Sequence, residues 1–224
     1  GALNVEHEHL RHVAEHALVV AGADRRDEPF EIQEALQSCE DYARWRGIAF
    51  TTRVVDGDVA HYFAEETRST DLLVLGMKGR FARVGLGSTT RWLVAHAPSP
   101  VMVITGPSLR VMSRILIAFD GTPTSRRAME FSRSLQEQVG WPLTILAAPR
   151  RPSQLDDVIE EAGSLAPEAQ IVTLDLARRR PAQLIEEVAD ESKHALLVLG
   201  AFAEPWFRQM LTGGTTGHVL THLR

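Results

Sequence analysis

The sequence predicts an α/β protein of two similar halves, each built on a parallel sheet with helices on both faces. Short apolar segments that suit strands alternate with longer segments that suit helices, and this alternation is typical of parallel sheets. The pentapeptide Leu-Leu-Val-Leu-Gly occurs at 72–76 and again at 196–200. A motif that returns at the same place in the order of elements indicates an internal duplication.

The length and composition set the class of protein. The 224 residues are enough for two ordinary domains, which we place at 1–108 and 109–224. With 44% hydrophobic and 24% charged residues, the chain has the composition of a soluble globular protein. A net charge of −5 does not favour nucleic acid as a partner. Cys39 is the only cysteine and no stretch reaches the roughly 20 apolar residues of a membrane span, so we expect a cytoplasmic protein.

The first half is expected to hold strands at 18–21, 48–55, 72–75 and 101–105, and helices at 6–17, 30–46, 58–67 and 88–96. The helix at 30–46 has apolar residues at helical spacing, Cys39 and Tyr42 among them, which predicts one buried face. Gly47 follows as a residue that ends a helix by taking positive φ. The apolar run at 72–75 does not alternate with polar residues, which suits a strand covered on both faces.

The second half is expected to hold strands at 114–119, 142–147, 169–174 and 195–199, and helices at about 123–139, 153–165, 181–191 and 215–223. Pro123 suits the first turn of its helix, where the missing N–H costs nothing. Asp156 and Asp157 lie near the positive end of the next helix, where carboxylates are favoured. This order of elements repeats that of the first half.

A glycine-bounded loop after the strand at 72–75 is the strongest candidate for a binding site. Gly76 and Gly79 can take positive φ and bring backbone N–H groups close to a ligand. Gly87 and Ser88 then begin a helix, and an anion is favoured at a helix N-terminus. The pattern indicates a phosphate cradle, although glycines after a strand can also make a simple turn.

Three motifs together resemble the universal stress protein family in its tandem, two-domain form. Gly76-Met77-Lys78-Gly79 with Gly87-Ser88 is similar to the family's glycine loop, and 115–122 resembles its opening strand, which ends in Asp. The segment 97–104 resembles its closing strand. The resemblance implies two Rossmann-like domains of the adenine-nucleotide alpha-hydrolase type, each with five parallel strands. It also implies a stress-response regulatory protein that binds ATP, alone or with Mg²⁺.

The resemblance assigns a role to particular residues of this chain. The phosphates would lie against Gly76, Lys78, Gly79, Gly87, Ser88 and Thr90, and Asp120 would contact the adenine or the ribose. Asp120 can also be an ordinary turn residue before Gly121. Nothing in the pattern indicates a metal site held by the protein alone. No catalytic constellation stands out, so an enzymatic role is limited to slow ATP hydrolysis.

The chain departs from the family pattern in two places that bear on the site. Seven residues separate Gly79 from Gly87, where the family has nine. In the second half, Ala203 replaces the second glycine of the loop, and Gly214 replaces the Ser or Thr that begins the helix. Because an alanine Cβ would crowd a turn that needs positive φ, we interpret the second half as the weaker nucleotide site.

Each half also lacks one terminal strand of the family fold. The first half has no opening strand that ends in Asp, and the second half stops at Arg224 before a closing strand. We expect these strands in sequence missing from this chain, with strand exchange as the alternative. A homodimer or an intramolecular pseudo-dimer and an unidentified protein partner are also expected. The competing hypothesis is an interaction module whose nucleotide sites are degenerate.

Overall fold

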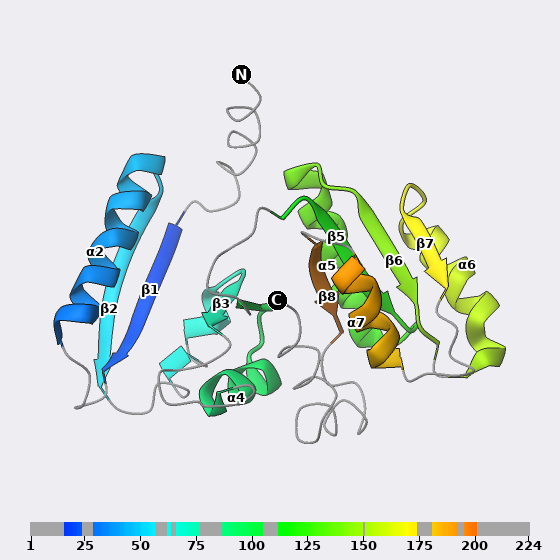
Figure 1. Cartoon of the computed structure of the whole chain (residues 1–224), viewed down its shortest axis with the longest axis horizontal. Coiled ribbons are helices and arrows are strands. Elements are labelled where there is room, and N and C mark those ends of the chain that lie inside the picture. The colour runs from blue at the N-terminus through cyan, green and yellow to red at the C-terminus, as the bar shows by residue number, and fades with distance from the viewer. Residues whose placement is uncertain are drawn as a thin grey trace. The chain divides into compact units, whose positions relative to one another are not determined.

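The computed structural model describes residues 16–23, 29–56, 62–63, 66–76, 87–104, 112–149, 151–173, 181–191 and 195–200 of the chain (Figure 1). Two compact units are present, Gly1–Glu66 and Thr67–Arg224, and each is described by itself. All strand pairs are parallel, as the sequence predicts. Within the described ranges, no helix has the length and apolar character needed to cross a membrane.

The described part of the first unit includes a two-stranded sheet and the helix α2. β1 is His16–Ala23, α2 is Pro29–Arg46 and β2 is Ala49–Asp56. The strands pair from His16 opposite Ala49 to Ala23 opposite Asp56. The helix expected at 6–17 is therefore wrong at its last two residues, because pairing with β2 extends β1 back to His16. The rest of that helix lies outside the described residues.

The end of α2 follows the predicted glycine stop. Gly47 has a φ of 70°, which is the left-handed conformation that glycine adopts without strain. The Gly47 N–H donates to the Arg44 carbonyl at 3.2 Å, and the Ile48 N–H donates to the Ala43 carbonyl at 2.9 Å. This pair of hydrogen bonds satisfies carbonyls that the helix leaves without partners at its end.

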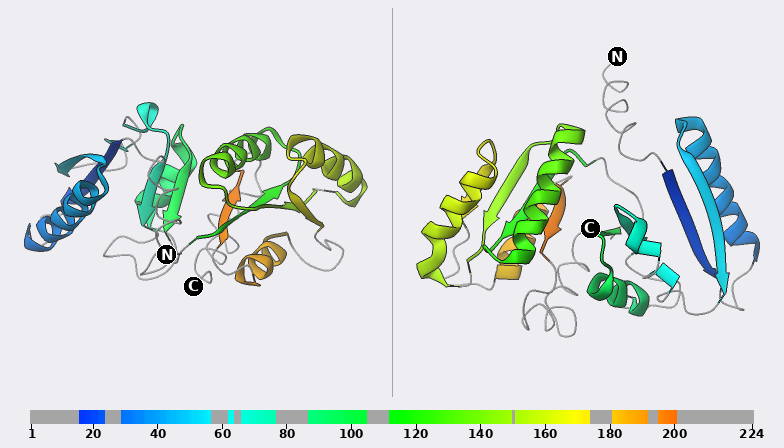
Figure 2. Two further views of the ribbon diagram at one scale, coloured as in Figure 1. Left: turned by 90° about the horizontal axis from the view of Figure 1, so that it is seen from above. Right: turned by 180° about the vertical axis from the view of Figure 1, so that it is seen from behind.

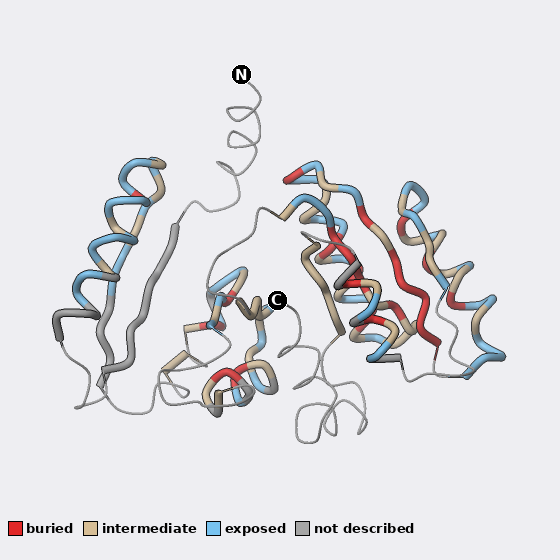
Figure 3. The backbone as a smooth tube through the Cα atoms, viewed as in Figure 1, coloured by how far each residue is buried: buried red, intermediate tan, exposed pale blue. Residues whose placement is uncertain are grey.

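The predicted buried face of α2 is wrong at two positions. Ala43 is buried, but Cys39 is exposed and Tyr42 keeps 58% of its surface accessible. Two of the described strands form the sheet beneath α2, and two strands cover less of the helix than a wider sheet would. Tyr42 instead packs against the exposed Trp45, with ring centroids 5.8 Å apart. Figure 3 shows how few positions along α2 are buried.

The second unit begins with the elements that carry the glycine loop. They are the 3-10 helix η2 at Thr67–Ser69, β3 at Leu73–Gly76, α4 at Ser88–His96 and β4 at Val101–Ile104. β3 pairs with β4 from Leu73 opposite Val101 to Gly76 opposite Ile104. Leu93 of α4 is fully buried. Of the helix expected at 58–67, residues 62, 63 and 66 are helical, Thr67 belongs to the 3-10 helix η2, and the others lie outside the described residues.

The remaining elements form the second half of the sequence repeat. They are β5 (Arg114–Phe119), α5 (Pro123–Val139), β6 (Leu143–Ala147), η3 (Pro152–Gln154), α6 (Leu155–Leu165), β7 (Gln170–Thr173), α7 (Pro181–Glu191) and β8 (Ala195–Leu199). Their sheet has the order β7-β6-β5-β8. The helix expected at 215–223 lies outside the described residues.

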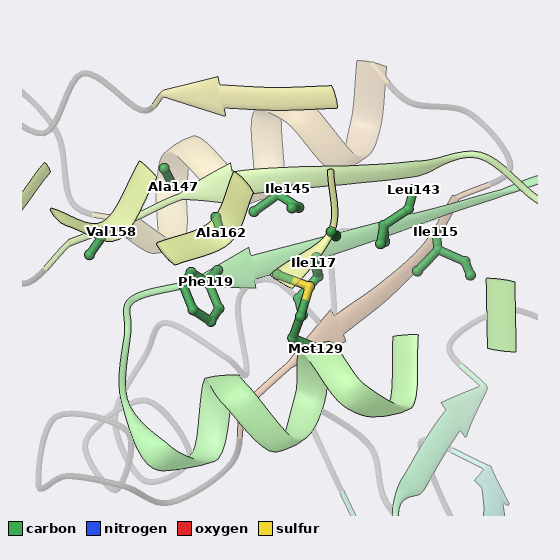
Figure 4. Close-up of a cluster of buried hydrophobic side chains, with 10 residues drawn as sticks. Ile115, Ile117, Phe119, Met129, Leu143, Ile145, Ala147, Val158 and Ala162 are labelled. Carbon is green, nitrogen blue, oxygen red and sulfur yellow. The ribbon is translucent and has the colours of Figure 1, made fainter. Parts of the chain in front are cut away.

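Two helix layers cover this sheet, as the sequence predicts. Alternate residues of β5 face opposite sides, because successive side chains of a strand point to opposite faces. Ile115, Ile117 and Phe119 pack with Met129 of α5 and with α6, as Figure 4 shows. Leu116 packs on the other side with α7. The sheet therefore lies between α5 and α6 on one face and α7 on the other (Figure 2).

The two halves of the repeat differ in how their strands are joined. β5 pairs with both β6 and β8, so the four described strands of the second half make one sheet. In the first half, β1 pairs with β2 and β3 pairs with β4, and no described strand joins the two pairs. The expectation of one sheet in each half is thus met only in the second half among the described residues.

Gly200 follows β8 at a point where the backbone approaches α5 closely. A Cβ placed on Gly200 would lie 2.7 Å from the Ser125 nitrogen and 2.8 Å from the Thr124 carbonyl carbon. Both are backbone atoms of the first turn of α5, so they cannot move aside as a flexible side chain would. The end of β8 and the start of α5 therefore fit together only because residue 200 has no side chain.

We expect Gly200→Ala to destabilise the protein by about 1–3 kcal/mol, because the methyl group overpacks against backbone. Gly163→Ala in α6 is the matched control, since its nearest neighbour would be the Ile171 Cδ1 at 3.8 Å. That control should be neutral or stabilising by up to about 1 kcal/mol, because alanine favours a helix. Urea unfolding of both variants measures the difference, and equal free energies of unfolding would contradict the close contact.

Candidate functional site

The two ends of the glycine loop are tied together by one hydrogen bond. Gly76 ends β3, and Thr90 lies in the first turn of α4. The Thr90 hydroxyl donates to the Gly76 carbonyl at 3.0 Å, and Thr90 is buried. A hydroxyl has one proton, so this proton is used to position the loop ends. The structure thus brings together two of the residues that the sequence assigned to phosphate.

The N-terminus of α4 has no side-chain cap. Its N-cap residue is Gly87, with φ −59° and ψ 151°, and among the described residues it has no side-chain cap hydrogen bond. The first turn of α4 also contains no acidic residue. A helix N-terminus carries partial positive charge and N–H groups without helical partners. The start of α4 at Ser88 is therefore suited to accept an anion.

The other assigned residues of this loop lie outside the described residues. Lys78 and Gly79 fall within 77–86, as do the basic residues Arg80 and Arg83. The described part of the candidate site therefore consists of the end of β3 and the start of α4. Their roles in phosphate binding stay predictions.

Asp120 follows β5 and makes a turn. One Asp120 carboxylate oxygen, Oδ1, accepts from the Thr122 N–H at 3.1 Å and from the Thr122 hydroxyl at 2.6 Å. Gly121 between them has a φ of 75°. The carboxylate thus fixes the path of the chain from β5 into α5. Asp120 follows β5, which lies in a different sheet from β3, and its contact with adenine or ribose stays a prediction.

The N-terminus of α5 is capped, in contrast to that of α4. Thr122 is the N-cap residue, and its hydroxyl oxygen accepts from the Ser125 N–H at 3.3 Å. Gly200 also approaches this turn, as described above. The start of α5 therefore has fewer groups available to an anion than the start of α4. The Thr122-Pro123 pair is the sequence signal that could have predicted this cap.

An ion pair beside Asp120 was missed by the sequence analysis. The Arg126 guanidinium of α5 donates to both carboxylate oxygens of Glu161 in α6, through Nε to Oε1 and through Nη2 to Oε2, the latter at 3.0 Å. The hydrogen bond to Glu161 and then its charge raise the pKa of Arg126, and the charge of Asp120 adds to this. No local pattern joins residues 35 positions apart.

The described side chains include no cluster of metal-binding type. Among these residues, no group of three or more His, Cys, Asp or Glu side chains could hold a metal ion. The described geometry is suited to an anion at the start of α4, and it places charged side chains beside Asp120. Neither arrangement contains a nucleophile paired with a base.

The chain is similar to known proteins over most of its length. The family model described as "Universal stress protein family" matches residues 7–105 and 112–224. Universal stress protein Rv1996 of Mycobacterium tuberculosis is 31% identical over 143 residues, which are 62% of this chain and 44% of that protein. Universal stress protein Slr1230 of Synechocystis is 24% identical over 67% of this chain and 54% of its own length. The chain thus spans about half the length of these relatives.

Solved structures have the same fold. A universal stress protein from Archaeoglobus fulgidus superposes with a TM-score of 0.64 at 16% identity, covering 99% of this chain and 87% of that one. A putative universal stress protein from Pseudomonas aeruginosa superposes with a TM-score of 0.64 at 19% identity, covering 93% of this chain and 80% of that one. The two separate matches to the family model agree with the internal duplication read from the sequence. The chain therefore belongs to the universal stress protein family, in its tandem form.

Proposed function

We propose that this universal stress protein binds an adenine nucleotide, ATP, through the glycine loop of its first half. The single observation that carries the proposal is the Thr90–Gly76 hydrogen bond next to the uncapped start of α4. The hydrogen bond fixes the strand end and the helix start at a constant separation. A polyphosphate placed between them would meet N–H groups on both sides.

Charge also favours the first half over the second. The loop between β3 and α4 contains Lys78, Arg80 and Arg83, and the first turn of α4 has no acidic residue. Lys78 would neutralise phosphate charge, as lysine does in other phosphate loops. When bound, Mg²⁺ would supply further positive charge to the phosphates. Asp120 would contact the base or the sugar in a second, weaker site.

The proposed role is regulatory. Bound nucleotide would order the glycine loop and change the surface that a protein partner meets, so occupancy of the site would act as the signal. Self-association, as a homodimer or as a pseudo-dimer of the two halves, would place two such loops in one assembly. ATP turnover, if it occurs, would be slow, because no described residue acts as a base beside the loop.

We expect Thr90→Val to weaken ATP binding several-fold and to destabilise the protein by about 1 kcal/mol. Valine keeps the shape but leaves the Gly76 carbonyl without its donor. Thr89→Val is the control, because it makes the same change one residue earlier in α4. Isothermal titration measures the Kd for ATP and urea unfolding measures stability. An unchanged Kd with reduced stability would make Thr90 purely structural.

We expect Gly87→Ala combined with Ser88→Ala to weaken ATP binding at least tenfold. Gly87 has a φ of −59°, which alanine adopts freely, so the change does not strain the backbone. Any loss of ATP affinity would come from crowding of the ligand by the new methyl group and from the missing Ser88 hydroxyl. Gly163→Ala with Ser164→Ala makes the same pair of changes in α6 and should leave the Kd unchanged. Equal ATP affinities of the two double variants would show that ATP does not bind at the start of α4.

Release of bound small molecules separates nucleotide binding from the alternative of an interaction module. The freshly purified protein is heated, and the supernatant is analysed by mass spectrometry. We expect an adenine nucleotide in stoichiometric amount. A blank, followed by no binding when ATP and Mg²⁺ are added, would favour the interaction module with degenerate sites.

A further inference from the structure

The helix α2 has a side on which two large aromatic residues are exposed. Tyr42 keeps 58% of its surface accessible and Trp45 keeps 71%, the highest value among the large hydrophobic side chains that the structure describes. Their rings pack against each other with centroids 5.8 Å apart, so they form one cluster. Tyrosine and tryptophan are enriched where proteins bind one another, and a cluster of exposed apolar surface marks such a place.

Helical spacing places two more exposed residues on the same side as these rings. Ser38 lies four residues before Tyr42, and Glu34 lies four residues before Ser38. The Ser38 hydroxyl donates to the Glu34 carbonyl at 2.9 Å, so it has a hydrogen bond that contact with another protein would not remove. We call Glu34, Ser38, Tyr42 and Trp45 the aromatic face of α2. The buried Ala43 is two residues from Trp45 and so lies on the opposite side of the helix.

Arg46 adds a positive charge to the aromatic face. Its guanidinium carbon lies 6.0 Å from the centroid of the Tyr42 ring and 5.6 Å from that of the Trp45 ring. A guanidinium over an aromatic ring is attracted to it. The charge of Arg46 therefore lies near the level of Tyr42, one turn before its own backbone. The aromatic face thus has a negative charge at Glu34, a positive charge near Tyr42 and the small Ser38 midway between them.

The charges on the polar side of α2 are paired within the helix instead. Arg44 contacts Glu40 at 3.0 Å and Asp41 at 2.9 Å, and the Gln37 amide donates to Asp41 at 3.1 Å. Such pairs of residues three or four positions apart stabilise an exposed helix by themselves. The polar side therefore supplies matched control positions for the aromatic face.

We propose that the aromatic face of α2 binds the same face of a second copy of this chain, as an antiparallel pair of helices related by a two-fold axis at Ser38. In a two-fold interface, each copy gives the other the same contacts. Equal steps of four residues from Ser38 then place Tyr42 of each copy opposite Glu34 of the other. The positive charge of Arg46 faces the carboxylate of Glu34 in the second copy, and this contact occurs twice.

The pattern along α2 favours this arrangement over the others. A small side chain at the axis lets the two helices approach closely at their crossing point. A parallel pair in the same register would place Glu34 opposite Glu34 and Arg46 opposite Arg46, and such like charges disfavour association. The antiparallel pair opposes unlike charges at both ends and covers both aromatic rings. The inference gives a surface to the self-association named in the proposed function, and it does not depend on nucleotide at the glycine loop.

The test exchanges charges between two copies of the full chain, without nucleotide. Sedimentation equilibrium measures the Kd of self-association. We expect Glu34→Arg and Arg46→Glu each to weaken it by roughly tenfold or more, because each variant opposes like charges at both contacts. When the two variants are mixed, both contacts join opposite charges again, so the variants should pair with each other about tenfold more tightly than either pairs with itself.

Two further variants separate this contact from general effects on the helix. Arg44→Glu reverses an arginine in the same last turn of α2 but on the polar side, and it should leave the Kd of self-association unchanged. Trp45→Ser removes the most exposed ring and should weaken self-association by roughly tenfold, as loss of a central aromatic residue does in other interfaces. Circular dichroism of each variant shows whether it is folded.

Cys39 offers an independent measurement, because it is the only cysteine of the chain and is exposed. It follows Ser38 directly, so the proposed pair holds two Cys39 thiols beside the two-fold axis. A short bifunctional maleimide should therefore link two copies of the unaltered chain. Gln37→Cys combined with Cys39→Ser moves the thiol to the polar side, and this variant should not be linked.

The outcomes judge this inference apart from the proposed function. If the unaltered chain is monomeric, or if the mixed charge variants pair no more tightly than each does alone, the aromatic face does not bind a second copy. Equal linkage through Cys39 and through a cysteine at position 37 would also overturn the antiparallel pair. The Kd for ATP is measured separately, so loss of self-association leaves the nucleotide site standing and loss of ATP binding leaves the α2 contact standing.

Discussion

The strand β5 is buried on both faces. The second half therefore needs a layer of helices on each side of its sheet. Ile115, Leu116, Ile117 and Phe119 are each no more than 1% exposed. Burying one such side chain contributes about 1.5–3 kcal/mol. Parallel pairing with β6 and β8 satisfies the backbone on both edges of β5. The turn at Asp120, the start of α5 and the end of β8 all follow from where this strand stops.

The helices α4 and α5 begin in different ways. α4 begins at a glycine without a capping side chain, and α5 begins at a threonine that caps its own helix. Capping stabilises a helix by about 1 kcal/mol, and it uses groups that a ligand would otherwise bind. The two helices occupy different places in the repeat, since the counterpart of α4 is the helix expected at 215–223, which lies outside the described residues.

Sequence patterns predicted the bounds of several helices and strands, but they could not predict contacts between distant residues. The bounds of β5, β8, α4 and α7 agree with the predictions, because apolar runs, prolines and glycines act locally. Periodicity placed Cys39 and Tyr42 in a buried face, but it could not show how narrow the sheet beneath them is. The Arg126–Glu161 pair joins two helices, and no local signal indicates it. A sequence motif indicated the glycine loop. The hydrogen bond from the Thr90 hydroxyl to the Gly76 carbonyl could not be predicted, because it depends on the distance between the two residues in the fold.

The Thr90–Gly76 hydrogen bond bears on how the length of the glycine loop can change. It joins residues 14 positions apart, so the intervening segment is closed at its base by the protein itself. The free energy of closing such a segment changes little with its length, roughly as the logarithm of the number of residues. Insertions and deletions within the segment are therefore expected to leave β3 and α4 in the same position relative to each other. A change in the length of this segment is therefore expected to cost its neighbours little free energy.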